Sequence, residues 1–260
     1  MKSKHFLMSV EEFELMEHPF GWKAEYFSGM GHFTPRDQIV QTRLTLRPQA
    51  RTADWQKYQV VPIDPLLTDL TIAAFFEAFQ DSVEFCDWSL DEIYAHAVKN
   101  INNYFQGVRG NPHPVSRMVI EPISQKIVGL ALFVIKKEDK VELDLLSVKP
   151  SHQRRGIATQ IVASAIDSLC ADGVREIRSG YHICNEVSRA WHHSLGFVEI
   201  PDFLLCRLKA AWYRDKIWRG EKLGVPEQLD EFATEQDRWT QLAEELLAIE
   251  VEKHRSQGLG

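Results

Sequence analysis

Apolar residues follow two spacings along the middle of the chain, and together they predict a mixed α/β fold. Short apolar runs at residues 115–121, 127–136 and 141–149 are joined by turns of only a few residues, which predicts three antiparallel neighbouring strands. Further strands are expected at 58–63, 174–183, 197–200 and 203–208. Helical spacing predicts helices that begin at Asp64-Pro65, at 88–105 with Ser89 and Glu92 as a capping pair, at 157–171 and at 186–194. Strands that alternate with helices after an antiparallel meander predict an α/β (α+β) fold, a mixed, mostly antiparallel sheet with helices on both faces.

The two ends of the chain have a different pattern. Residues 1–55 predict a small β-rich extension: a helix start at Ser9, a hairpin from 22–27 to 32–34, and an alternating strand at 38–46. A loose arm packed on the main domain is the alternative. Residues 209–222 continue the last strand, and a long amphipathic helix begins at Gly224-Val225-Pro226. We therefore divide the chain into 1–55, a domain at 56–208, and a helical extension at 209–260.

The C-terminal helix carries one continuous apolar stripe opposite a strongly acidic face. Its apolar residues recur at spacings of three, four or seven: Leu229, Phe232, Trp239, Leu242, Leu246 and Ile249. Such a helix must bury this stripe either on its own domain or on a second subunit, so a homodimer stays open.

Composition and charge exclude several classes of partner and location. The net charge of −7 and the pI near 5.8 argue against nucleic acid or an anionic membrane as the main partner, and they suit a basic or amine-bearing one. The longest uncharged apolar run, Ile127 to Ile135, is far shorter than the roughly 20 residues of a membrane span. No secretory signal is expected at the N-terminus. The four cysteines contain no CxxC pair, which indicates reduced thiols in a cytoplasmic protein, and neither His182 with Cys184 nor the adjacent His192 and His193 predicts a metal site.

The most specific chemistry lies between the strand at 141–149 and the helix that follows it. Small residues at 156 and 158 allow a ligand to approach the backbone closely, and the first turn of a helix offers unpaired N–H groups to an anion. Arg154 and Arg155 add positive charge. This loop predicts a pyrophosphate site, although it is neither a Walker loop nor a dinucleotide fingerprint.

Two motifs resemble the signatures of the GNAT (GCN5-related N-acetyltransferase) superfamily. Gln153-x-x-Gly156-x-Ala158 matches the CoA-binding pattern of that family, and Asn185-x-x-Ser188 followed by Leu195-Gly196-Phe197 is similar to its second signature. The order of strands and helices also matches the core of the family. The resemblance covers about residues 58–208 and leaves the first 55 and the last 50 residues outside it.

The resemblance implies transfer of an acetyl group from acetyl-CoA to an amine, without a metal. It implies that CoA is held by main-chain groups of one strand and by the loop and helix starts after it: Leu146, Ser147, Val148, Gln153, Arg154, Arg155, Gly156, Ile157, Ala158, Thr159, Asn185 and Ser188.

Candidates for proton transfer follow from the same alignment. His192 falls where many relatives carry a Tyr that protonates the departing thiolate, and helical spacing puts it on one face with Asn185 and Ser188. Val187, Trp191 and Leu195 are then expected to form the buried face. The alternative is that His192 only lines the pocket and water supplies the proton.

Glu142 and Asp144 are the candidate bases. Strand alternation predicts that they share one side with Leu146 and Val148, and Glu142 takes the position of the catalytic Glu of histone-acetylating relatives. Either carboxylate could instead hold a cationic amine or merely lie on the sheet surface.

Three functions therefore stay open at this point: an N-acetyltransferase, a CoA-binding sensor or interaction module without turnover, and an acyltransferase for a longer acyl-CoA. The absence of Tyr at position 192 favours the second of these. The acceptor amine is not identified by any residue pattern.

Overall fold

The computed structural model describes residues 4–47, 58–225 and 227–257, and it contains two compact units. Of the described residues, one unit contains 41–47 and 58–199, and the other contains 4–40, 200–225 and 227–257. The expected boundary at 55/56 and the expected helix start at Pro226 lie outside the described residues. The division into 1–55, 56–208 and 209–260 stays a prediction.

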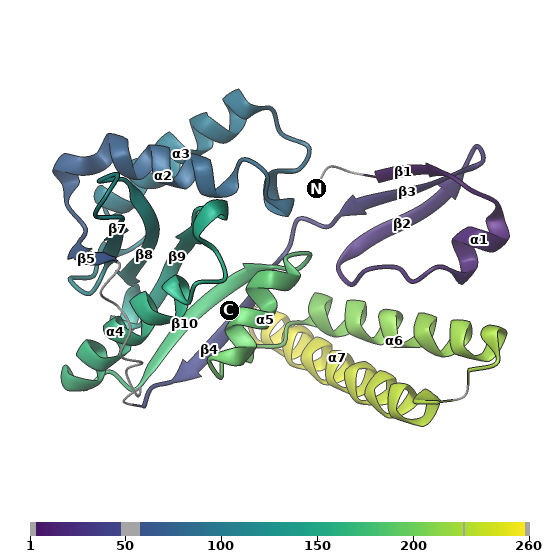
Figure 1. Cartoon of the computed structure of the whole chain (residues 1–260). Helices are drawn as coiled ribbons and strands as arrows, with labels where there is room; N and C mark the ends of the chain where they lie inside the picture. The colour runs from purple at the N-terminus through teal and green to yellow at the C-terminus, as the bar shows by residue number, and fades with distance from the viewer. Residues whose placement is uncertain (1–3, 48–57, 226, 258–260) are drawn as a thin grey trace. The chain divides into compact units, whose positions relative to one another are not determined.

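The described residues form eleven strands, seven α-helices and four short 3-10 helices (Figure 1). The strands are β1 Lys4–Leu7, β2 Trp22–Phe27, β3 Met30–Pro35, β4 Ile39–Thr45, β5 Gln59–Pro62, β6 Asn111–Pro112, β7 Arg117–Ile120, β8 Ile127–Ile135, β9 Val141–Val148, β10 Glu176–His182 and β11 Val198–Glu199. The helices are α1 Val10–Leu15, α2 Thr68–Phe79, α3 Leu90–Phe105, α4 Ile157–Ala171, α5 Glu186–Ser194, α6 Phe203–Leu223 and α7 Leu229–Gln257, with 3-10 turns η1 Pro65–Leu67, η2 Val83–Phe85, η3 Lys137–Asp139 and η4 Pro150–His152.

A large mixed sheet runs through the first unit. Its strand order is β11-β4-β10-β9-β8-β7-β5, and β6 pairs with β8. The pairs of β9 with β8, β8 with β7, and β7 with β5 are antiparallel, while β10 lies parallel to β9. The expected mixed, mostly antiparallel sheet is therefore confirmed.

Strand β4 lies in this large sheet, between β11 and β10, although we expected the strand at 38–46 to belong to the N-terminal extension. Its alternate residues Val40, Thr42 and Leu44 are buried, and the Thr42 hydroxyl donates to the Ser179 carbonyl of β10 at 3.1 Å. Alternation predicted the strand itself, but strand order depends on contacts far apart in sequence.

Helices cover both faces of the sheet, as β8 shows most clearly. Ala131 and Phe133 pack in the cluster that contains the apolar side of α4, while Leu132 and Val134 pack in the cluster with α2 and α3. Successive strand residues point to opposite faces, so one strand of apolar residues serves two cores.

The second unit contains a small antiparallel sheet in the order β1-β3-β2, which confirms the expected N-terminal hairpin and β-rich appendage. Ser9 and Glu12 form the expected capping box of α1. The expected C-terminal helix is also present as α7, and none of the helices in the described residues is long and apolar enough to cross a membrane.

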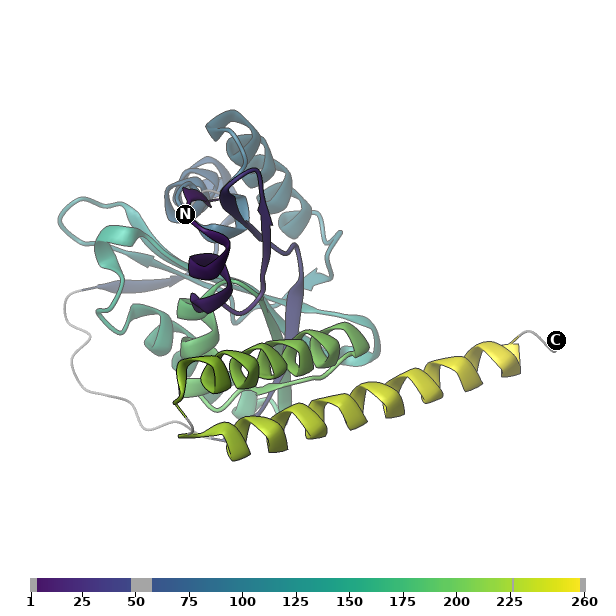
Figure 2. The same ribbon diagram turned by 90° about the vertical axis from the view of Figure 1, so that its right-hand side faces the viewer.

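Helices α6 and α7 lie side by side as a hairpin (Figure 2). Trp239 of α7 is buried with Cys206 of α6, and Leu242 and Leu246 pack against them, so the middle of the apolar stripe packs within its own chain. Ile249, farther along the stripe, is 53% exposed. The strand expected at 203–208 and its continuation to 222 were wrong, because these residues are α6. The Asp202 side chain caps this helix by accepting the Leu205 N–H at 2.7 Å.

Candidate functional site

The site begins where β9 contains a bulge. Phe133 of β8 faces Leu143 and Leu132 faces Leu145, so Asp144 is the extra residue of β9. The bulge shifts the alternation of the strand: Leu143 and Leu146 both pack toward α4, whereas Leu145 packs toward α2 and α3.

The expectation that Glu142 and Asp144 share a side with Leu146 and Val148 was therefore wrong. One inserted residue exchanges the two faces of the strand beyond it. Leu146 and Val148 contact the same core as Val141 and Leu143, which puts the Glu142 side chain on the opposite face.

Strands β9 and β10 separate at the same place. In the described residues their parallel pairing is confined to three positions, Val141–Leu143 against Ile177–Ser179. From residue 144 onward, β9 keeps its partner β8 on one edge only. Asp144 has a side chain that is only 3% exposed, yet the residue as a whole is half-buried, so its exposed part is the main chain. The separation leaves main-chain N–H and C=O groups of β9 available to a ligand.

The loop after β9 ends at a helix start with the features of an anion site. Gly156 is the N-cap of α4 with φ of 76°, and a Cβ placed there would meet no atom within 4 Å. Residues 153–156 are exposed, and the first helical hydrogen bond runs from Gln160 N–H to the Gly156 carbonyl. The N–H groups before Gln160 are the unpaired donors that a helix start offers to an anion.

Side chains of the loop mostly brace the loop itself. Gln153 donates to the Val148 carbonyl at 3.0 Å, and Arg155 donates to the Ser151 carbonyl at 2.8 Å and to the Tyr58 hydroxyl at 3.3 Å. Arg154 is exposed, with φ of 58°. Among the other expected contacts, Ile157 is buried in the core, Ala158 is half-buried, and the Thr159 hydroxyl accepts the indole N–H of Trp191 at 3.2 Å.

Asn185 lies at the end of β10 and caps α5, where its Oδ1 accepts the Ser188 N–H at 2.9 Å. Its Nδ2 donates to Oε1 of Glu84 in η2 at 2.6 Å. This bond ties the α2–α3 connection to the carboxyl end of β10. Glu84 had no sequence signal, because nothing in the pattern relates positions 101 residues apart.

His192 lies at the point where β9 and β10 separate. Its Nε2 is 3.0 Å from Ser179 Oγ, its Nδ1 donates to the Ser188 carbonyl at 2.8 Å, and Ser179 Oγ is 3.2 Å from the Leu143 carbonyl. Burial lowers the pKa of His192, while the hydrogen bond to Ser188 acts in the opposite direction. Ser179 is a further residue that sequence reasoning missed, since a serine inside a strand carries no distinctive pattern.

The face of α5 that is buried differs from the expected one. His192 is the buried residue of this helix, with 3% of its surface exposed, whereas Val187 is 76% exposed. Trp191 and Leu195 are half-buried. Trp191 and Leu195 still pack against the main core as expected, and His192 is buried beside them, where Ser179 is its hydrogen-bonding partner.

The two candidate bases lie in different surroundings. Asp144 forms an ion pair with Arg109 at 2.7 Å, and its side chain is almost wholly buried. Glu142 is partly exposed, and its carboxylate is 3.7 Å from the Lys136 ammonium. Only Glu142 therefore presents a carboxylate that an acceptor can reach from solvent.

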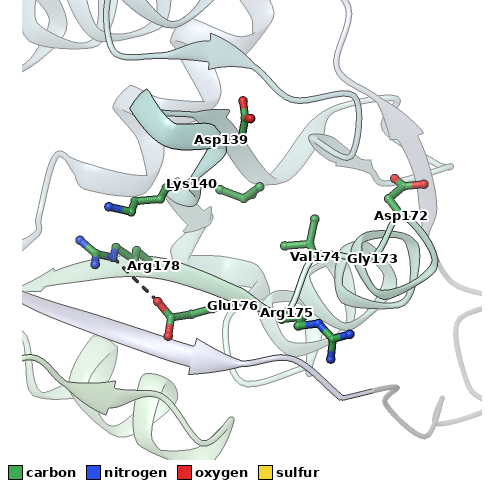
Figure 3. A pocket seen from close by; sticks show the side chains of 9 residues that line it. Asp139, Lys140, Asp172, Gly173, Val174, Arg175, Glu176 and Arg178 are labelled. Atoms are coloured by element: carbon green, nitrogen blue, oxygen red, sulfur yellow. Dashed lines mark ion pairs between the residues drawn. The ribbon is translucent and has the colours of Figure 1, made fainter.

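A surface hollow of about 330 Å³ lies at the opposite end of the same two strands (Figure 3). Asp139, Lys140, Asp172 and Arg175 line it together with the Glu176–Arg178 pair. Charges of both signs alternate around it, and it lies where β9 and β10 are still paired, so it is separate from the separation point.

Comparison with known proteins finds a family that matches the middle of the chain. Residues 72–197, just under half of the chain, match the model of the acetyltransferase (GNAT) family. The matched segment includes the β9 bulge, the helix start at Gly156 and all of α5. No curated protein is significantly similar to the chain in sequence.

Several solved structures match part of the chain at low similarity. A GCN5-related N-acetyltransferase from Sphaerobacter thermophilus is 17% identical, with 62% of this chain and 48% of that chain covered and a TM-score of 0.46. The PaiA N-acetyltransferase from Thermoplasma acidophilum, in complex with coenzyme A, is 15% identical over 54% and 89% of the two chains, with a TM-score of 0.44. An aminoglycoside N-acetyltransferase in complex with CoA is 18% identical over 56% and 90%, with a TM-score of 0.41. The chain spans about half the length of the first, and the similarity to the GNAT family rests on the family match at residues 72–197.

Proposed function

We propose that this protein is an N-acetyltransferase that moves the acetyl group of acetyl-CoA directly to an amine in a ternary complex. The observation that supports it most is the separation of β9 from β10 beside the start of α4. A linear cofactor with a pyrophosphate at one end and amides and a thioester at the other needs both an anion site and free main-chain groups in line with it.

In this proposal the pyrophosphate lies on the N–H groups of residues 154–159, with Gly156 leaving room for it. Main-chain groups of Leu146, Ser147 and Val148 receive the pantetheine and the thioester carbonyl. Asn185 and Ser188, which are joined by the capping hydrogen bond of α5, are proposed to border the gap between β9 and β10 on the α5 side.

The chemical step joins the amine nitrogen to the acetyl carbon and breaks the carbon–sulfur bond. The amine must be neutral, so a base first takes one proton from the ammonium form. After the attack the nitrogen gives up a second proton to solvent as the amide forms, and the CoA thiolate leaves and takes up one proton, so one proton is released in each turnover. Glu142 is the proposed base, because its carboxylate is partly exposed. His192 is the proposed source of the proton that the thiolate takes up, with solvent as the alternative.

Two other functions are the alternatives to this proposal. A binding module without turnover is favoured by one observation: both ring nitrogens of His192 already have partners in Ser188 and Ser179. A longer acyl chain would use the same gap between β9 and β10.

The decisive experiment is a screen of amines with acetyl-CoA that reads release of free thiol, run beside calorimetry with CoA. We expect CoA binding in the wild type, no binding in Gly156→Glu, and thiol release with at least one amine. Binding without thiol release for any amine would select the module without turnover. CoA affinity that is unchanged in Gly156→Glu would refute the proposed site.

A further inference from the structure

Arg109 holds one residue of β9 by both its side chain and its main chain. The Nε and Nη2 atoms of Arg109 donate to Asp144 Oδ1 at 3.1 and 2.7 Å, and Nη2 also donates to the Asp144 carbonyl at 3.2 Å. An arginine can do this because its planar fork presents several donors at fixed angles, which a lysine cannot.

Asp144 is also the extra residue of the β9 bulge, and without Arg109 its position would be unfavourable. Its side chain is 3% exposed, and among the described residues its Oδ2 has no hydrogen-bonding partner. Burial of a carboxylate costs free energy unless a positive charge accompanies it. The carboxylate therefore depends on Arg109, and so does the local backbone that directs it inward.

Arg109 is itself anchored to a helix outside the sheet. Its Nη1 donates to the side-chain oxygen of Asn100 in α3, and the Asn100 amide lies 3.2 Å from Nε2 of His96. The Lys136 ammonium donates to the main-chain carbonyl of Arg109. The arginine that holds the β9 bulge is therefore itself held by α3 through its side chain and by the residue after β8 through its main chain.

We propose that Arg109 is a positioning residue for CoA: by holding Asp144 it sets the point at which β9 leaves β10, and with it the direction of the main chain at residues 145–148. This inference rests on the proposed function, which gives that main chain to the pantetheine and thioester. It assigns Asp144 a structural role in place of the proton transfer that the sequence suggested for it.

The test compares two ligands that share the nucleotide but differ in the pantetheine. The affinity for CoA should depend on Arg109, whereas the affinity for 3′-phospho-ADP, which lacks the pantetheine, should not. Arg109→Met alone would leave the Asp144 charge buried and unpaired and could unfold the chain. We therefore choose Arg109→Lys, and the double variant Arg109→Met with Asp144→Leu, which replaces the ion pair by an apolar pair.

Calorimetry should show that the double variant binds CoA at least about tenfold more weakly, as expected when one or two pantetheine hydrogen bonds are lost. Its affinity for 3′-phospho-ADP should stay within about twofold of the wild type, and Arg109→Lys should lie between the two for CoA. Arg178→Met is the matched control, because Arg178 is an arginine of the neighbouring strand at its paired end, in register with Glu142.

Wild-type CoA affinity in a double variant that melts like the wild type would overturn the inference while leaving the proposed function intact. Equal losses for CoA and 3′-phospho-ADP would overturn it too, because the effect would then not be specific to the pantetheine. Absence of CoA binding in the wild type would instead refute the proposed function, and the inference with it.

Discussion

Two glycines at opposite ends of α4 separate backbone strain from ligand contact. Gly156 precedes the helix with φ of 76°, and Gly173 follows it with φ of 82°. A Cβ built on either glycine meets no atom within 4 Å. Alanine at each position therefore introduces the same backbone strain and no steric overlap, but only the methyl group at 156 would stand in the proposed pyrophosphate site.

The magnitudes of the two effects differ enough to be resolved. A non-glycine residue in the left-handed region costs about 1–2 kcal/mol, and the reduced entropy of the unfolded chain returns about 0.4–1 kcal/mol. A net loss of about 1 kcal/mol lowers the melting temperature by about 2–4 °C for a domain of this size. Loss of one hydrogen bond to a charged group costs about 1.5–3 kcal/mol, which is about 10- to 150-fold in CoA affinity.

Calorimetric melting without ligand and titration with CoA measure both quantities. We expect Gly156→Ala and Gly173→Ala to melt at similar, slightly reduced temperatures, and only Gly156→Ala to lose CoA affinity. Equal CoA affinity in both variants and the wild type would refute the anion site at the start of α4. An equal loss in both variants would mean that strain in α4, and not a lost contact, is responsible.

Three further predictions concern other parts of the chain. If His192 is the general acid, His192→Ala should lower kcat about 10²–10⁴-fold and leave CoA affinity nearly intact. His192→Tyr should recover part of the lost kcat. Equal, mild effects on kcat in His192→Ala and in the control His193→Ala would leave solvent as the proton source. Trp239→Ala should lower the free energy of unfolding by about 3–5 kcal/mol, because Trp239 is buried against α6. The control Trp218→Ala should change the free energy of unfolding little, because Trp218 is 36% exposed. Equal urea midpoints in the two variants would contradict this packing. Burial lowers the pKa of His96, His113 and His192 in the folded chain. The unfolded chain therefore binds protons first as the pH falls below about 6.5, and the urea midpoint should drop between pH 7.5 and 5.5. An unchanged urea midpoint would count against these lowered pKa values.

Local patterns predicted most elements of the sheet and its helices. The helices at 157–171 and 186–194 have the predicted bounds, and Ser89 with Glu92 forms the predicted capping box of α3. These elements depend on nearby residues, through apolar periodicity and helix caps. The error at 203–208 arose because a run of apolar residues is ambiguous between strand and helix, and the cap at Asp202 was the signal that would have decided it.

The bulge had a signal that neighbouring residues concealed. Leu143 and Leu146 face one core at a spacing of three, which a regular strand does not allow. Because Leu145 is also apolar, the apolar pattern of the strand shows no visible break at the bulge. The contact between Arg109 and the bulge could not be predicted from sequence for another reason. Arg109 lies 35 residues before Asp144, and the residues around Arg109 show no periodicity that could relate the two positions.

The hydrogen bonds of His192 decide what an acid role at this position requires. A carbonyl can only accept, so the bond to Ser188 places a proton on Nδ1. In the neutral ring Nε2 then accepts from Ser179, and the Ser179 hydroxyl cannot also donate to Leu143. Only the imidazolium allows Nε2 to donate to Ser179 and Ser179 to donate to Leu143, which links the ring to β9 beside its bulge.

Burial opposes that charged form, since it lowers the pKa of His192. The contacts that would deliver a proton toward the thioester therefore require the imidazolium, whereas burial of the ring favours the neutral imidazole. An enzyme that uses the imidazolium must lose activity as the pH rises through this lowered pKa, so the basic limb of its pH–rate profile would lie below about pH 6.5. If full activity persists above neutral pH, His192 is neutral during turnover. Its role is then to hold Ser179 where β9 and β10 separate, and solvent protonates the thiolate.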